Sequence, residues 1–175
     1  MIPADTNIPE PFSKEALSAG LGSLLRLRGM TIATAESCTG GGIGAAIAST
    51  DGASDYFVGG VISYATRIKE DILGVDATLI ERFGVVSEQT ALSMNKGVRA
   101  LMNADAAISI TGYAGASGGD EFASNGTVWI CAATGKESKT KCLNLRGART
   151  DNLSTAVMEA LALAISLLEE TGPEQ

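Results

Sequence analysis

TIATAESCTGGGIGAAIAS, residues 31–49, combines three kinds of local signal in one short segment. Its first five residues are apolar or β-branched, which favours a buried strand. Three consecutive glycines then indicate a tight turn, and the small residues from Ile43 to Ser49 are typical of a closely packed helix. We therefore predict a strand, a glycine turn and a helix, which together form the building unit of an α/β fold.

The segments on either side extend this pattern. Apolar residues recur at helical spacing before residue 29 and again within 91–102 and 153–168, and short β-branched runs lie between them. Strands that alternate with helices predict a three-layer α/β/α fold, and a closing hairpin makes its sheet mixed and mainly parallel. Residues 1–12 are expected to form a flexible lead and 13–171 a single domain. The predicted helices are 17–28, 43–49, 66–73, 88–102 and 149–171, and the predicted strands are 31–35, 57–64, 106–111, 127–133 and 139–145.

Composition excludes several classes of protein and site. The net charge of −7 removes the basic surface that nucleic acids usually require. The chain contains no histidine, so neither a Ser-His pair nor a histidine metal site can form within it. The three cysteines lack C-x-x-C spacing, and no apolar run reaches the ~18 residues of a membrane span. We expect a cytoplasmic protein without metal or organic cofactor, whose base is a lysine, a tyrosine or a carboxylate.

The junction at residues 36–41 places a serine where negative charge can be stabilised. The first N–H groups of a helix have no partner within it, so those of residues 39–41 are candidates to receive an oxyanion formed by attack of Ser37. The alternative is that Ser37 or Thr39 simply caps the helix. Cys38 is intrinsically the stronger nucleophile, but in extended backbone its side chain points away from that of Ser37. We assign the attack to the serine.

Three further features are candidates for the site. Lys69 lies on the short helix after the second strand, where burial would lower its pKa and make it a base; the alternative is a solvated lysine beside two acidic neighbours. The glycine-rich loop 111–119 offers N–H groups that can cradle an anion, or else it forms an ordinary turn. Arg149 opens the last helix, where a cation faces an unfavourable dipole unless an anion is bound. It can equally be a surface charge.

Short motifs in a fixed order carry a resemblance to a known family. Together they resemble the CinA C-terminal domain family over about residues 15–170. The resemblance implies a compact α/β/α domain with nicotinamide-nucleotide amidase activity, standing alone without the larger N-terminal partner that some relatives carry. The motifs are TAESCTGG (34–41), GGVISY (59–64) followed by Lys69, LGV (73–75), GVVS (84–87), AD (104–105), TGYAG (111–115), GG (118–119), GTV (126–128) and GAR (147–149).

On this resemblance, Ser37 is the nucleophile, Lys69 its base and Tyr64 a neighbouring tyrosine of the site. The implied reaction converts nicotinamide mononucleotide to nicotinic acid mononucleotide and ammonia, in a protein that we expect to form a homo-oligomer. The rival expectation is a non-catalytic nucleotide-binding or protein-interaction domain associated with competence and DNA damage. The family pattern is not followed at Thr66, Ala116, Ser124, Asn125 and Ala148. The residues expected to bind substrate are Thr39, Gly40, Gly41, Thr111, Gly112, Gly115 and, as a phosphate contact, Arg149.

Overall fold

The computed structural model describes residues 13–115 and 117–171. The predicted lead at 1–12 and the family departure at Ala116 lie outside these residues. The helices are α1 (Lys14–Arg28), α2 (Gly42–Ala48), α3 (Thr66–Asp71), α4 (Ala77–Phe83), α5 (Glu88–Met102) and α6 (Arg149–Glu170), with a short 3-10 helix η1 (Ala53–Asp55). The strands are β1 (Ile32–Glu36), β2 (Phe57–Ile62), β3 (Ala106–Gly112), β4 (Thr127–Thr134) and β5 (Ser138–Asn144).

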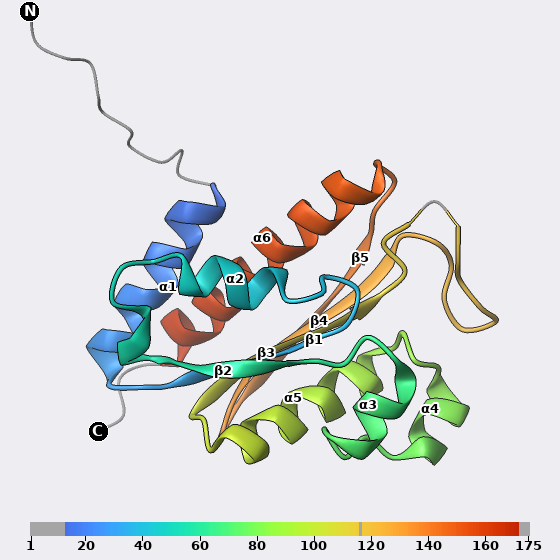
Figure 1. The fold of residues 1–175 in the computed structure, drawn as a ribbon, viewed down its shortest axis with the longest axis horizontal. Helices are drawn as coiled ribbons and strands as arrows, with labels where there is room; N and C mark the ends of the chain where they lie inside the picture. The colour runs from blue at the N-terminus through green and yellow to red at the C-terminus, as the bar shows by residue number, and fades with distance from the viewer. Residues whose placement is uncertain (1–12, 116, 172–175) are drawn as a thin grey trace, which may run out of the picture.

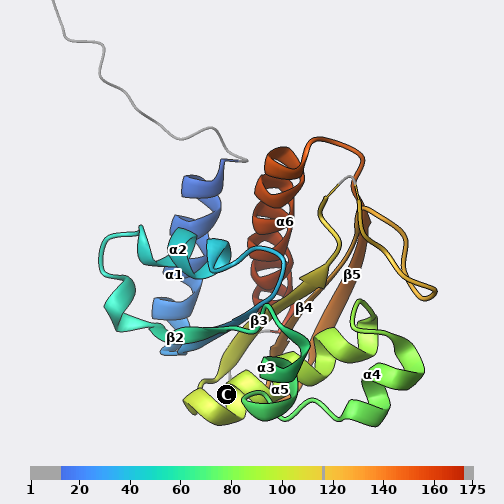
Figure 2. The same cartoon turned by 45° about the vertical axis from the view of Figure 1, so that its right-hand side comes forward.

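The strands form one sheet in the order β2-β1-β3-β4-β5. β1 pairs in parallel with both β2 and β3, whereas β4 is antiparallel to both β3 and β5. All strands except β4 therefore point the same way, which confirms a mixed, mainly parallel sheet. Helices α1, α2 and α6 cover one face, and α3, α4 and α5 lie on the other (Figures 1 and 2). The predicted three-layer α/β/α arrangement is confirmed.

The segment at residues 31–49 forms the predicted strand, turn and helix. β1 is buried along its whole length, because helices cover both faces of the sheet. Gly40 and Gly41 then adopt φ angles of 59° and 101°, a region that favours glycine, and the chain turns directly into α2. In the neighbouring strand, a Cβ on Gly60 would lie 2.1 Å from Thr34 Oγ1. Glycine at that position lets β2 pack closely beside β1.

β2 and α4 are among the elements that differ from the prediction. β2 ends at Ile62, so Tyr64 lies beyond the strand and not within it. α4 is a helix that no pattern in the sequence predicted. It has 7 residues, none of them buried, and Asp76 caps it by accepting a hydrogen bond from Thr78 N at 2.8 Å. A short helix without a buried stripe produces no periodic signal.

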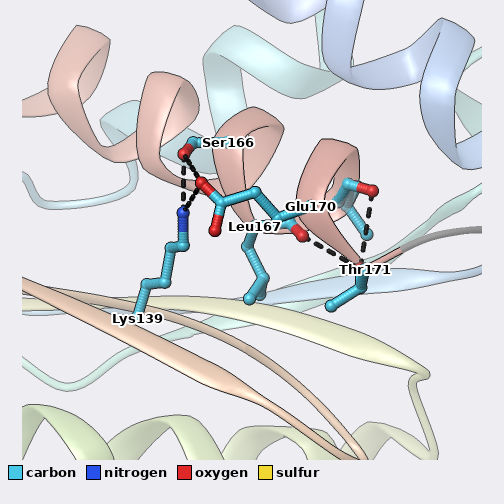
Figure 3. A network of polar contacts seen from close by, with 6 residues as sticks. Lys139, Ser166, Leu167, Glu170 and Thr171 are labelled. Atoms are coloured by element: carbon cyan, nitrogen blue, oxygen red, sulfur yellow. Dashed lines mark hydrogen bonds and ion pairs between the residues drawn. The ribbon is translucent and has the colours of Figure 1, made fainter.

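α6 is a core helix that packs against α1, α2 and the sheet. Within the described residues it is the one helix long and apolar enough to cross a membrane, with a mean hydropathy of 1.3 over 18 residues. The sequence pattern did not predict a helix of this kind, and burial against the sheet explains its apolar face. Near its end, Lys139 of β5 donates to Ser166 Oγ at 2.8 Å and contacts Glu170 (Figure 3). These contacts tie the edge strand β5 to the helix.

Candidate active site

A pocket of about 370 Å³ opens where β1, β2 and β3 end. Ser37 follows β1, Tyr64 lies beyond β2, and Thr111 is near the end of β3. Parallel strands that end at one edge of a sheet bring distant residues together, and α/β proteins usually bind ligands at this edge. α3 adds Lys69 to the pocket, and the start of α6 adds Arg149. The fold thus gathers most of the residues that the sequence singled out.

Lys69 and Ser37 form a buried hydrogen-bonded pair. Lys69 Nζ lies 2.9 Å from Ser37 Oγ and donates a second hydrogen bond to the Ser63 carbonyl at 2.6 Å. Only 1% of Lys69 and 8% of Ser37 is exposed. Ser63 is itself held in place, because its N–H donates to the Glu36 carbonyl at 2.7 Å and so joins the end of β2 to that of β1. The solvated lysine that the sequence left open is not observed.

Burial lowers the pKa of Lys69 from 10.5 to about 8. A carboxylate beside the amine would oppose this effect by holding the proton in place. The described wall of the pocket carries no aspartate or glutamate, and Glu36 directs its carboxylate to α2 instead. A substantial fraction of the Lys69 amine is therefore neutral in mildly alkaline solution, where it can accept the proton of Ser37.

Glu36 closes the amino end of α2. Its carboxylate accepts hydrogen bonds from Ile43 N at 2.9 Å, from Gly44 N at 2.7 Å and from the Thr39 hydroxyl at 2.7 Å. Glu36 is 1% exposed, so this carboxylate takes the place of solvent or a ligand at the helix end. The helix end is therefore occupied at the N–H groups of Ile43 and Gly44, which follow the N–H groups of residues 39–41 that we considered for an oxyanion.

Thr39, Gly40 and Gly41 accordingly do not line the pocket. The Thr39 hydroxyl is engaged by Glu36, Gly40 N donates to Ser37 O at 3.0 Å, and Gly41 lines a separate groove. Their assignment as substrate-binding residues does not match these positions. A different donor is adjacent to the serine: the Cys38 N–H makes no backbone hydrogen bond within the described part of the chain. This N–H is adjacent to Ser37 and is a candidate donor to an oxyanion.

The Cys38 thiol is held protonated. Burial raises its pKa from 9.0 to about 11, and the positive charges of Arg149 and Lys69 oppose only part of that rise. Cys38 is 7% exposed and belongs to the core cluster that α1, α2 and α6 cover, with one side at the pocket wall. Since the thiolate is the reactive form, this thiol competes poorly with Ser37 at neutral pH.

Tyr64 and Arg149 meet at the pocket surface. Arg149 Nη2 donates to the Tyr64 hydroxyl at 3.2 Å, and Tyr64 is 61% exposed. Gly115 lies against the same guanidinium, because a Cβ on Gly115 would lie 3.2 Å from Arg149 Nη1. Thr111 and Gly112 also line the pocket, although the Thr111 hydroxyl already donates to the Val85 carbonyl at 2.8 Å. The structure therefore brings together these five of the predicted residues.

Two residues that hold the site together were missed in the sequence. Ser63 acts through its carbonyl on Lys69, a role that residue type does not reveal. Asn152 is 5% exposed and joins α6 to the loop after β3 through the Ala114 carbonyl at 3.0 Å. A signal for Asn152 was present, since it follows Arg149 by three positions and therefore lies on the same face of a helix.

The pocket is cationic in an acidic protein. Its described wall carries Lys69 and Arg149 and no acidic side chain, although the net charge of the chain is −7. Across residues 13–115 and 117–171, no three Cys, Asp or Glu side chains gather in a way that could hold a metal ion. Fold and site define an α/β domain that pairs a buried lysine with a serine in a pocket suited to an anionic ligand.

The chain belongs to the CinA C-terminal domain family, whose model matches residues 14–168. It is 38% identical over 159 residues to a CinA-like protein of Cytophaga hutchinsonii, in an alignment that covers 91% of this chain and 38% of that protein. It is 49% identical over 117 residues to a CinA-like protein of Synechocystis sp., covering 67% of this chain and 28% of the relative. The chain thus spans well under half the length of these curated relatives.

Solved structures support the same assignment. A competence or damage-inducible protein from Enterobacter asburiae superposes with a TM-score of 0.86 at 34% identity, covering 89% of this chain and 98% of that one. A CinA superfamily protein from Enterobacter cloacae gives a TM-score of 0.87 at 32% identity, covering 96% and 99%. The family and the fold predicted from the motifs are confirmed, and the chain is related to competence and damage-inducible proteins.

Proposed function

We propose that the chain hydrolyses a carboxamide through an acyl-enzyme, with Ser37 as nucleophile and Lys69 as base. The observation that carries this proposal is the 2.9 Å contact between Lys69 Nζ and Ser37 Oγ in a chain without histidine. The neutral amine of Lys69 accepts the Ser37 proton while Oγ attacks the carboxamide carbon. The carbonyl oxygen becomes an oxyanion, and the Cys38 N–H is the proposed donor to it.

The intermediate then breaks its C–N bond. The Lys69 ammonium gives its proton to the departing nitrogen, ammonia leaves, and the acyl group remains as an ester on Ser37 Oγ. Water attacks this ester while Lys69 accepts a proton from it, and the same amine returns that proton to Ser37 Oγ as the carboxylic acid departs. The Ser63 carbonyl accepts a hydrogen bond from Nζ and keeps the amine beside Oγ. Tyr64 is proposed to orient the substrate.

The proposed substrate is nicotinamide mononucleotide, which becomes nicotinic acid mononucleotide and ammonia. The family motifs support this choice, and so does the chemistry of the pocket. Its volume of about 370 Å³ lies within the usual range for small-molecule sites. Arg149 is the proposed phosphate contact, because a guanidinium matches the geometry of phosphate oxygens.

The test measures ammonia release by the purified chain from nicotinamide mononucleotide and from free nicotinamide. We expect release from the nucleotide, none above background in Ser37→Ala, and a kcat/KM for free nicotinamide lower by about tenfold or more, because it lacks the phosphate. Equal kcat/KM for both substrates would remove the phosphate contact from the proposal. No ammonia from either substrate would favour the rival function, a non-catalytic nucleotide-binding or interaction domain.

A further inference from the structure

Asn152 fixes the loop after β3 against the start of α6. Its Nδ2 donates to the carbonyls of Ala114 and Gly147, both at 3.0 Å, and its Oδ1 accepts from Gly147 N at 2.9 Å. Asn152 is 5% exposed, so water competes little for these bonds. The buried side chain of Asn152 therefore links two separate backbone segments, one at Ala114 and one at Gly147.

The bond to the Ala114 carbonyl also orients a peptide plane. In a trans peptide the carbonyl and the following N–H point in opposite directions, and the described chain has no cis peptide. Since the Ala114 carbonyl points at Asn152, the Gly115 N–H points away from Asn152. Asn152 lines a separate cavity of about 230 Å³, whereas Ala114 lines the main pocket and Gly115 borders both. The Gly115 N–H thus points away from the separate cavity that Asn152 lines, at a glycine that also borders the main pocket.

This donor has no acceptor among the described residues. Gly115 N makes no hydrogen bond within residues 13–115 and 117–171. Arg149 lies beside it, with Nη1 3.2 Å from the position of a Cβ on Gly115. A backbone N–H next to a guanidinium suits an anionic oxygen, because both donate to the same acceptor group. Arg149 and Asn152 are three residues apart on α6, so one helix face positions both donors.

We propose that Asn152 is a positioning residue for the ligand phosphate. It turns the Ala114–Gly115 peptide so that the Gly115 N–H and Arg149 together receive the oxygens of a phosphate monoester. This inference rests on the proposed function, in which the substrate is a nucleotide. It concerns ligand affinity and not the chemistry at Ser37.

The test follows the Gly115 amide by ¹H–¹⁵N NMR while inorganic phosphate is added. In the wild type the Gly115 signal should shift and saturate. Asn152→Asp keeps the shape of the side chain but sets a carboxylate against two carbonyl oxygens, so the apparent phosphate affinity should fall about tenfold or more. Asn152→Ser introduces a shorter, uncharged side chain and should also weaken phosphate binding. This variant replaces Asn152→Asp in the test if Asn152→Asp does not fold.

Asn95 supplies a matched control away from the pocket. Its Nδ2 also joins two backbone carbonyls, Ala107 O at 2.8 Å and Cys131 O at 3.2 Å, and it is 1% exposed. Asn95→Asp and Asn95→Ser should lower stability as the Asn152 changes do. Phosphate affinity per folded molecule should stay within about twofold of wild type, because distant sites act independently. Equal losses of affinity at both asparagines would overturn a specific role for Asn152.

Nucleotide kinetics give a second readout. KM should rise in Asn152→Ser while kcat at saturation is nearly unchanged, the pattern of lost uniform binding. The inference would be overturned if the Gly115 signal of the wild type did not shift when phosphate is added. It would also be overturned if the Asn152 variants bound phosphate with wild-type affinity. The phosphate titration does not require turnover. A chain that binds phosphate at Gly115 but releases no ammonia would therefore contradict the amidase proposal and leave the role of Asn152 intact.

Discussion

Burial favours Ser37 over the adjacent Cys38 as the proposed nucleophile. Cys38 is intrinsically the more reactive type, but with a pKa of about 11 only roughly one molecule in 10⁴ carries the thiolate at pH 7. Ser37 has the Lys69 amine 2.9 Å from its oxygen. The environments of Cys38 and Ser37 therefore reverse the order of nucleophilic reactivity that side-chain chemistry alone would give.

Substitution of the two residues separates these roles. Ser37→Ala should abolish ammonia release while leaving the fold and nucleotide binding nearly intact, because it removes the attacking oxygen and little volume. Cys38→Ala should stay active, with a modest loss of stability from a small vacancy in the core. Steady-state assays of both variants check this. An inactive Cys38→Ala beside a Ser37→Ala variant at near wild-type rate would reverse the assignment.

At the residue scale, the sequence predicted Ser37 and Lys69 but not the contacts of the residues around them. The family motifs pointed to Ser37 and Lys69, which the structure brings together. The sequence indicates an open anion site at the helix end after Ser37, because it shows where the helix begins but not which side chain caps it. Glu36 caps that helix end and engages the Thr39 hydroxyl, and Thr39, Gly40 and Gly41 do not line the pocket.

At the scale of elements, α2 depends on the strand before it. The glycine-rich amino end of α2 has no capping side chain at its own first position. Glu36, the last residue of β1, supplies the acceptors instead and bonds two N–H groups of the first helical turn. The turn that carries Ser37 lies between these two elements, so the cap joins the two ends of that turn.

Glu36→Gln tests the cap. An amide presents one oxygen and one NH₂ group, so one of the two helix N–H groups would lose its acceptor. We expect unfolding free energy to fall by about 1 to 3 kcal/mol in urea denaturation. Glu137→Gln, in the exposed β4–β5 turn, is the matched control and should change it by less than about 0.5 kcal/mol. Equal effects of the two changes would show that the buried carboxylate is not a specific cap.

The elements were predictable where packing leaves a pattern. β1, α5 and α6 bury a strand or a helical stripe, and the sequence displays the matching periods. α4 buries none of its residues and was not predicted. The local sequence pattern could not predict the order of the strands in the sheet either, because β1 and β3 pair although they lie about 70 residues apart along the chain.

At the scale of the whole molecule, the lowered pKa of Lys69 is a property of the folded state. In the sequence Lys69 is next to Glu70 and Asp71, which fits a solvated helix. The fold instead encloses Lys69 between the ends of β1 and β2 and leaves Asp71 exposed. The lowered pKa of the amine follows from this enclosure, and no local property of the segment predicts it.

The most direct test of the account is the pH dependence of kcat/KM for nicotinamide mononucleotide. Only the neutral amine can accept the Ser37 proton, so kcat/KM should rise with pH to a plateau, with a midpoint near the Lys69 pKa of about 8. Lys69→Met should stay folded, because it removes a buried amine, and should lose activity by ~10²- to 10⁴-fold. Lys69→Arg should fail similarly, since guanidinium stays protonated. Near wild-type kcat/KM with an unchanged pH profile in either variant would contradict Lys69 as the base.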